Sequence, residues 1–140
     1  MFNYVTGFVF SKDLQHVVLL EKLSPAWQKG LLNGVGGKIE DGESPIQAMV
    51  RECEEETGVF ISESNWTRYA HLTKPTYFEL DVFFSISDLA FSAKTIEKEQ
   101  VHLLKIDNIP NNIIPNLKWL IPLALDQSLK FKKPVTFIEN

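Results

Sequence analysis

The residues whose types and spacing favour chemistry lie between Gly36 and Val59. In that segment Glu52, Glu55 and Glu56 stand at positions i, i+3 and i+4, so a helix would bring their carboxylates to one face. Like charges at this spacing repel and cost about 0.2–0.5 kcal/mol per pair in an isolated helix. The pattern therefore predicts a cation beside these three side chains.

A magnesium ion suits these carboxylates best. Mg²⁺ prefers oxygen ligands, keeps several waters, and is usually shared between a few carboxylates and the phosphates of a substrate. Mn²⁺ accepts similar ligands and is the second choice of ion. A solvated acidic helix face is the alternative interpretation, but the residues that flank the glutamates favour the metal site.

Clear start and stop signals flank the glutamates. Ser44 is a good N-cap, Pro45 suits the first helical position because it has no amide hydrogen, and Gln47 completes an S-x-x-Q capping box. Gly58 favours the left-handed conformation that ends a helix. A helix is therefore expected between a glycine-containing loop and this glycine, with a buried stripe made of Ile46, Met49, Val50 and Cys53.

This loop and helix resemble the Nudix box. The matching positions are Gly37, Glu43, Arg51, Glu52, Glu55, Glu56, Gly58 and Val59. Every fixed position of the box is present, and the only departure is Cys53 at an aliphatic site, which a small apolar thiol can fill. The resemblance spans residues 37–59 and is specific, because a motif is strongest when many spaced positions match at once.

The resemblance implies an α/β Nudix fold, in which a central mixed β-sheet is sandwiched between helices and the box forms a loop-helix-loop. At 140 residues the chain fits one domain, so residues 1–140 are expected to be a single Nudix hydrolase domain. Alternation and turn signals predict strands at residues 4–10, 17–20, 66–72, 76–86, 101–106 and 134–139, a second amphipathic helix at 116–129, and loops at 24–38, 60–65 and 88–100.

The resemblance also implies a set of metal ligands: Glu52, Glu55, Glu56 and the backbone carbonyl of Gly36. Nudix enzymes often supply a further glutamate from a later loop, and Glu97 and Glu99 both lie in such a segment. Glu97 is taken as an additional metal ligand. The general base stays open among these loop and box glutamates, and the catalytic candidates are Glu52, Glu55 and Glu99.

Four residues of the box are expected to be structural: Gly37, Glu43, Arg51 and Gly58. The resemblance implies that Arg51 pairs with Glu43 and ties the helix to the preceding loop, and we rank this role above direct catalysis. Two lysines are candidates for phosphate binding as point charges. Lys38 directly follows the paired glycines, and Lys22 ends a predicted strand, where an exposed surface lysine is an equal alternative.

The stretch Asn33-Gly-Val-Gly-Gly-Lys38 resembles the MutT-type branch of the family, which hydrolyses purine nucleoside triphosphates, including oxidised ones such as 8-oxo-dGTP. In that branch the asparagine binds the purine edge, so Asn33 is a base-reading candidate. Its alternative role is that of a turn residue, because Asn-Gly is a strong turn dipeptide. Asn116 and Leu117 stand where that branch carries acids that read the oxidised base, so Asn116 is a substrate-binding candidate without implied 8-oxo-guanine specificity.

Aromatic residues provide two further candidates. Phe83 shares one face of the 76–86 strand with Glu79 and Asp81, and it would border the substrate if that face lines the cleft. Solvent exposure is the simpler account of the two acids. Trp27 lies in a predicted loop and is either a lid or stacking platform, or packs against the sheet, and packing is the slightly favoured interpretation.

These features predict a Mg²⁺-dependent pyrophosphohydrolase that converts a nucleoside triphosphate, with a purine or oxidised purine base, to the monophosphate and pyrophosphate. One alternative is hydrolysis of ADP-ribose or of a dinucleoside polyphosphate, because Pro75 and Tyr77 lie near positions that mark enzymes for these substrates. A second alternative is a nucleotide-sensing Nudix domain without activity. The intact glutamate set argues against this second alternative.

Composition limits the possible binding partners and the expected cellular location of the protein. The net charge of −4 argues against binding a nucleic-acid polymer, which needs a basic face, but permits a small-molecule nucleotide. One cysteine excludes an internal disulfide. No apolar run approaches the length of a membrane span and the N-terminus lacks a signal core, so a cytoplasmic protein without membrane contact is expected. A monomer and a homodimer are both compatible with the sequence.

Overall fold

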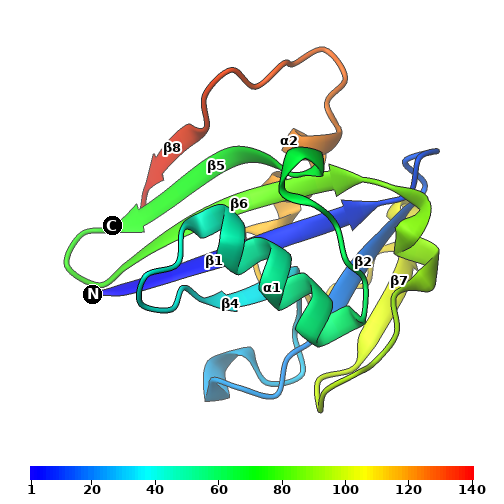
Figure 1. Ribbon diagram of the computed structural model, residues 1–140, viewed down its shortest axis with the longest axis horizontal. Coiled ribbons are helices and arrows are strands. Elements are labelled where there is room, and N and C mark those ends of the chain that lie inside the picture. The colour runs from blue at the N-terminus through cyan, green and yellow to red at the C-terminus, as the bar shows by residue number, and fades with distance from the viewer.

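The computed structural model describes residues 1–140 as an eight-stranded mixed β-sheet with one helix on each face (Figure 1). The helices are α1 (Pro45–Thr57) and α2 (Leu117–Leu125). The strands are β1 (Phe2–Phe10), β2 (His16–Glu21), β3 (Leu32–Asn33), β4 (Val35–Lys38), β5 (Thr67–Lys74), β6 (Phe78–Ile86), β7 (Val101–Lys105) and β8 (Val135–Ile138). The predicted α/β class and the predicted Nudix-type mixed sheet between helices are confirmed.

Strand β1 is the centre of the sheet. The strands run in the order β3-β2-β1-β6-β5-β8, with β4 paired to β1 and β7 paired to β2. β1 and β6 pair in parallel along their whole length, from Phe2 opposite Phe78 to Phe10 opposite Ile86. β1 pairs antiparallel with β2 and with β4 on its other side. One strand therefore connects the box segment to the rest of the sheet.

Alternation along β1 and β6 divides the core into two layers. Val5 and Val9 pack with the apolar face of α1, whereas Phe8 and Phe10 pack with α2 on the opposite side of the sheet. Successive side chains of a strand point to opposite faces, so one strand can serve both layers. The sequence of β6 divides in the same way, and this division decides which of its residues can approach a ligand.

Helix α1 begins and ends at the expected residues. The Ser44 side chain accepts a hydrogen bond from the Gln47 backbone N–H, and the Gln47 side chain accepts one from the Ser44 backbone N–H. Gly58 ends the helix with φ 75°. Met49 and Cys53 are fully buried against the sheet, as predicted, and Ala48 is fully buried as well.

Two segments differ from the sequence-based expectation. Residues 32–38, expected as a loop, form β3 and β4 because the backbone of β4 pairs with β1 from Tyr4 opposite Lys38 to Gly7 opposite Val35. This pairing partner is distant in sequence, and glycine has low strand propensity, so no local signal shows it.

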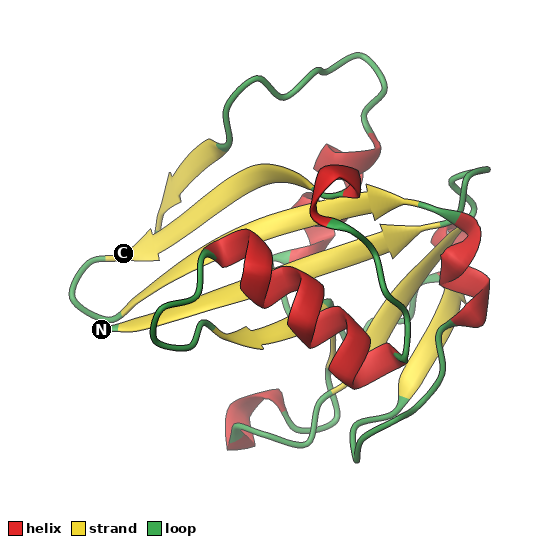
Figure 2. Cartoon of the chain, in the orientation of Figure 1, coloured by secondary structure: helices red, strands yellow, loops and turns green.

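The helix expected at residues 116–129 ends at Leu125 and has Pro122 inside it. Asp126 stops it, because its carboxylate accepts hydrogen bonds from the backbone N–H and the hydroxyl of Ser128. Such local side-chain bonds compete with helix continuation. A loop then leads to β8, which pairs in parallel with β5 (Figure 2). The other expected strands are present as β1, β2, β5, β6 and β7 with small changes at their ends. Neither helix has the length and apolar character that crossing a membrane requires.

Tyr69 of β5 connects the sheet to α2. The buried Tyr69 hydroxyl donates a 2.7 Å hydrogen bond to the Leu120 carbonyl oxygen. Tyr69→Phe should lower the free energy of unfolding by about 1–2 kcal/mol, because a buried hydrogen bond is lost. Tyr77→Phe, at an exposed position, should change it by no more than about 0.5 kcal/mol. Urea unfolding measures both, and equal values for the two variants would contradict the prediction.

Candidate active site

Arg51 ties helix α1 to the loop that precedes it. Its guanidinium donates to both carboxylate oxygens of Glu43, at 2.7 Å from Nε and 2.9 Å from Nη2. Nη2 also donates to the Lys38 carbonyl oxygen at the end of β4, at 3.1 Å. Fork-to-fork pairs of this kind are stronger and more directional than single ion pairs. The hydrogen bonds that Arg51 donates to Glu43 hold the pKa of Glu43 below its usual value, and the same bonds raise the pKa of Arg51.

The same guanidinium also contacts two of the predicted metal ligands. Arg51 Nη1 lies 2.9 Å from Glu52 Oε1 and 3.1 Å from Glu55 Oε2. These contacts offset part of the repulsion between the carboxylates of α1. Arg51 therefore fixes the direction of the acidic side chains as well as the position of the helix.

Two glycines of β4 allow the carboxylates to reach the sheet. A Cβ at Gly37 would lie 2.7 Å from Glu52 Oε1, and a Cβ at Gly36 would lie 2.0 Å from the Val5 carbonyl oxygen. The Gly36 backbone N–H donates a 2.8 Å hydrogen bond to Glu56 Oε1. Any side chain at these two positions would displace a carboxylate or open the pairing of β4 with β1.

The three predicted metal glutamates differ in environment. Glu56 is 7% exposed, and burial, only partly offset by the Gly36 hydrogen bond, raises its pKa to about 8. Burial also raises the pKa of Glu52, against the opposing effect of Arg51. The Glu55 side chain is 51% exposed. Of the three glutamates, Glu56 has lost the most hydration through burial. A cation at this site would therefore stabilise the ionised form of Glu56 more than that of the other two.

The donor set fits a hard divalent cation. Each of the three glutamates uses one oxygen in the contacts described, namely Glu52 Oε1, Glu55 Oε2 and Glu56 Oε1, so each keeps a second oxygen. No three His, Cys, Asp or Glu side chains converge as a ready ligand cluster, because these carboxylates are directed toward Arg51 and the Gly36 N–H. The chemistry of the donors matches Mg²⁺.

The two loop glutamates lie in different settings. Both oxygens of Glu99 are engaged, Oε1 with Lys22 Nζ at 3.0 Å and Oε2 with the Leu23 backbone N–H at 2.7 Å. The predicted phosphate-binding Lys22 and the predicted catalytic Glu99 thus neutralise each other. Glu97 is exposed, and its charge is among the causes that raise the pKa of Glu52. The catalytic and metal-binding roles of these residues stay predictions.

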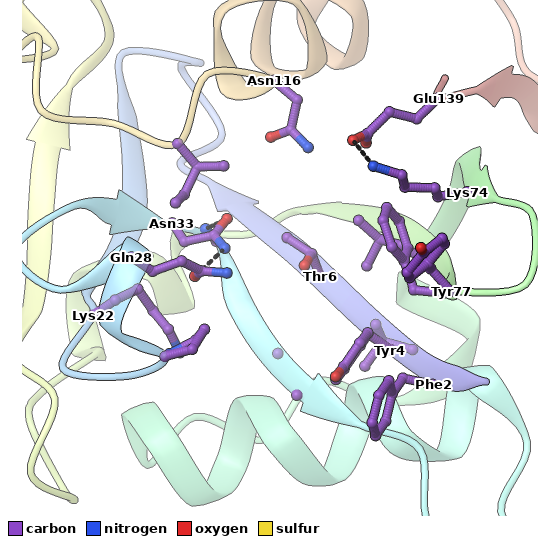
Figure 3. A pocket seen from close by; sticks show the side chains of 18 of the residues that line it. Phe2, Tyr4, Thr6, Lys22, Gln28, Asn33, Lys74, Tyr77, Asn116 and Glu139 are labelled. Atoms are coloured by element: carbon purple, nitrogen blue, oxygen red, sulfur yellow. Dashed lines mark hydrogen bonds and ion pairs between the residues drawn. The ribbon is translucent and has the colours of Figure 1, made fainter.

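A cavity of about 630 Å³ opens beside the carboxylates, on the α2 side of the sheet (Figure 3). Gly36 and Gly37 form part of its wall, so the backbone of β4 separates it from the glutamates. Three predicted substrate-binding residues line it: Lys22, Asn33 and Asn116. Its volume is in the range of pockets that hold small-molecule ligands.

Asn33 makes the contact of a turn residue, and its predicted base-reading role stays a prediction. Its Oδ1 accepts a 2.8 Å hydrogen bond from the Gly34 backbone N–H, as a turn residue would, and its Nδ2 donates to Gln28 Oε1 at 3.4 Å. Gln28 belongs to a short 3₁₀ turn, Ala26–Gln28, and also lines the cavity. No sequence motif indicates Gln28.

Two aromatic predictions need correction. Phe83 does not border the cavity: it is 3% exposed and buried in the layer beneath α1. Phe78 and Leu80, which point to the other face of β6, line the cavity instead, because alternation sends their side chains toward α2. Trp27, for which packing on the sheet was slightly favoured, is 65% exposed at the cavity.

Lys38 is not among the residues that line the cavity. It is exposed, and its Nζ lies 5.5 Å from the centre of the Phe2 ring. Sequence reasoning also missed the end of the cavity formed by the N-terminal strand, the β5–β6 turn and the C-terminus. The missed residues there are Phe2, Tyr4, Lys74, Phe78 and Glu139, with Tyr77 noted only for its spacing. They come from three separate parts of the chain, so no linear pattern joins them.

The fold is that of a known family, and the chain belongs to it: the NUDIX domain family matches residues 2–123. The protein is therefore a Nudix hydrolase, an enzyme family that generally uses divalent cations. Comparison with curated proteins found no significant match.

Solved structures with the same fold include MutT proteins. A structure from work on MutT of Aliivibrio salmonicida and Vibrio cholerae is 26% identical, with a TM-score of 0.68 over 87% of this chain and 98% of that one. MutT of Bacillus halodurans is 21% identical, with a TM-score of 0.69 over 100% of this chain and 91% of that one. A NUDIX hydrolase of Nitrosomonas europaea is 19% identical, with a TM-score of 0.70 over 99% of this chain and 79% of that one.

The raised pKa of Glu56 predicts a pH-dependent stability in the absence of metal. The pKa is about 8 in the folded protein against an ordinary value of 4.5, so the folded state binds more protons between these values. The free energy of unfolding should therefore fall as the pH rises through this window, by about 1 kcal/mol or more. Urea unfolding in EDTA at several pH values measures the slope.

Two variants test the assignment of this slope to Glu56. Glu56→Gln cannot titrate and should give a flatter profile, whereas Glu54→Gln, an exposed glutamate on the same helix, should keep the wild-type slope. Equal slopes for the wild-type protein and Glu56→Gln would show that Glu56 does not cause the pH dependence.

Proposed function

We propose that residues 1–140 form a single Nudix domain that acts as a Mg²⁺-dependent pyrophosphohydrolase and converts a purine nucleoside triphosphate to its monophosphate and pyrophosphate. The observation that supports this most is the position of Glu52 and Glu56 directly behind Gly37 and Gly36, which form the wall of a nucleotide-sized cavity. The likeness to a MutT structure at 26% identity supports the same substrate class.

The charges around the cavity favour a cation-dependent reaction. Its two lysines are already paired with glutamates, Lys22 with Glu99 at 3.0 Å and Lys74 with Glu139 at 3.9 Å. The glutamates of α1 add further negative charge beside its wall. A polyphosphate would meet a net negative surface here, so its binding requires an added cation. When bound, Mg²⁺ supplies neutralisation of phosphate charge and activation of water.

Residues of the chain have separate roles in this proposal. Glu52, Glu55, Glu56 and the Gly36 carbonyl oxygen hold the ion, and Arg51 orients the first two. A box or loop glutamate accepts the proton of the attacking water, with Glu52, Glu55 and Glu99 as the candidates. Asn33 and Asn116 lie on the cavity wall, where their amides can hydrogen-bond the nucleotide.

A second candidate function is the hydrolysis of a dinucleoside polyphosphate or of ADP-ribose. The cavity extends past Asn33 to the exposed ring of Tyr77, which provides a surface on which a second base or ring could stack. Oxidised purines such as 8-oxo-dGTP belong to the first candidate function, although an amide, Asn116, faces the cavity where an acid would favour them.

A substrate panel tests the proposed function. Pyrophosphate or phosphate-ester release is measured from the eight common nucleoside triphosphates and deoxynucleoside triphosphates, 8-oxo-dGTP, ADP-ribose and diadenosine polyphosphates, with Mg²⁺, with Mn²⁺ and with EDTA. Purine triphosphates should be cleaved fastest, and EDTA should stop the reaction. Absence of metal-dependent turnover for every compound would refute the proposal.

A matched pair of variants tests the metal site. The double variant Glu55→Gln, Glu56→Gln should lose at least about 100-fold in kcat, because it removes two charged ligands. Glu54→Gln, which removes an exposed glutamate between Cys53 and Glu55, should keep wild-type activity. Circular dichroism checks that the fold is retained, and a folded double variant with full activity would contradict the assignment.

A further inference from the structure

The C-terminal strand builds the end of the cavity that lies farthest from the box. β8 pairs in parallel with β5 from Ala70 opposite Val135 to Thr73 opposite Ile138. The Glu139 backbone N–H then donates a 2.8 Å hydrogen bond to the Thr73 carbonyl oxygen. This strand lies beyond residue 123, where the family match ends.

Alternation along β8 directs Glu139 into the cavity. Val135, Phe137 and Glu139 lie on one face of the strand, and the Phe137 ring packs on Trp119 of α2 with 4.5 Å between ring centres. Glu139 therefore points to the α2 side of the sheet, where the cavity lies. Figure 3 shows Glu139 and Lys74 directed toward each other, across the cavity from Asn33.

The Glu139 carboxylate is free to accept hydrogen bonds. Its side chain is 56% exposed, and its contact with Lys74 Nζ, at 3.9 Å, is longer than a hydrogen bond. Lys74 Nζ is also held 5.4 Å from the centre of the Tyr77 ring. A carboxylate accepts hydrogen bonds and donates none, so this end of the cavity favours N–H groups.

The opposite ends of the cavity differ in what they can bind. β8 is separated from β4 by four strand spacings, or about 19 Å across the sheet. The metal glutamates lie behind β4, so the phosphates of a nucleotide belong at that end. Glu139 and its partner Lys74 together present no net positive charge to phosphate, and they lie at the end toward which the base would extend.

We propose that Glu139 is a specificity-determining residue that accepts hydrogen bonds from the N–H donors on the edge of the substrate base remote from the sugar. This inference depends on the proposed function for the class of its substrate, a nucleotide. The exocyclic amino groups of guanine, adenine and cytosine share the required chemistry. Hypoxanthine and unsubstituted purine lack the amino group of guanine and adenine, and uracil carries a carbonyl oxygen in place of the amino group of cytosine.

Binding of nucleoside monophosphates tests the inference without requiring turnover. Dissociation constants are measured by calorimetry in Mg²⁺ for three pairs: GMP and IMP, AMP and purine riboside monophosphate, and CMP and UMP. At least one amino-bearing member should bind about tenfold more tightly than its counterpart, and that pair identifies the base. The same pair should differ in KM among the triphosphates.

Two variants separate recognition from a structural effect of the strand. Glu139→Ala should reduce the preference to within about twofold, whereas Thr136→Ala, on the other face of β8, should keep it. Absence of any preference in the wild-type protein, or a preference that persists in Glu139→Ala, would overturn the inference. If only the role of Glu139 is wrong, the wild-type protein still shows metal-dependent turnover. If the proposed function is wrong, the wild-type protein shows no such turnover.

Discussion

The pairing of Arg51 with Glu43 is the interaction on which the site depends. One guanidinium reaches both oxygens of Glu43, the carbonyl oxygen of Lys38, and the carboxylates of Glu52 and Glu55. It therefore connects the loop, the end of β4 and the acidic face of α1. Without it, close like charges would push the side chains of α1 apart, and the helix would lose its tie to the strand that lines the cavity.

The glycines of β4 also support the site, because they have no side chains. The sheet must bring its backbone against the glutamates on one side and against the cavity on the other, and a side chain at Gly36 or Gly37 would fill that space. β1 holds β4 in place through four antiparallel residue pairs and is itself held by its long parallel pairing with β6. Only the backbone of β4 therefore lies between the carboxylates and the cavity.

The charges at the site favour binding of an added cation. Glutamates pair with the lysines of the cavity, and burial raises the pKa of Glu56 and Glu52, which disfavours their ionised forms. A divalent cation reverses this preference, because a nearby positive charge favours the ionised carboxylate. Metal binding, carboxylate ionisation and phosphate binding are therefore expected to be coupled.

The sequence by itself determined the box helix and the class of fold. Ser44, Gln47 and Gly58 set the ends of α1 through contacts within a few residues, and the spacing of the glutamates follows from the helical repeat. Strand periodicity located most of the sheet for the same reason, because each signal is local. The predicted roles of the glutamates rest on that spacing and on the family resemblance.

Only the tertiary structure decided what surrounds the box. The face of Phe83, the exposure of Trp27 and the pairing of Lys22 with Glu99 depend on which segments meet in space. Glu139 reaches the cavity only because β8 pairs with β5, more than 60 residues earlier in the chain. Such contacts arise from burial and backbone pairing between distant segments, and no local pattern of residue types records them.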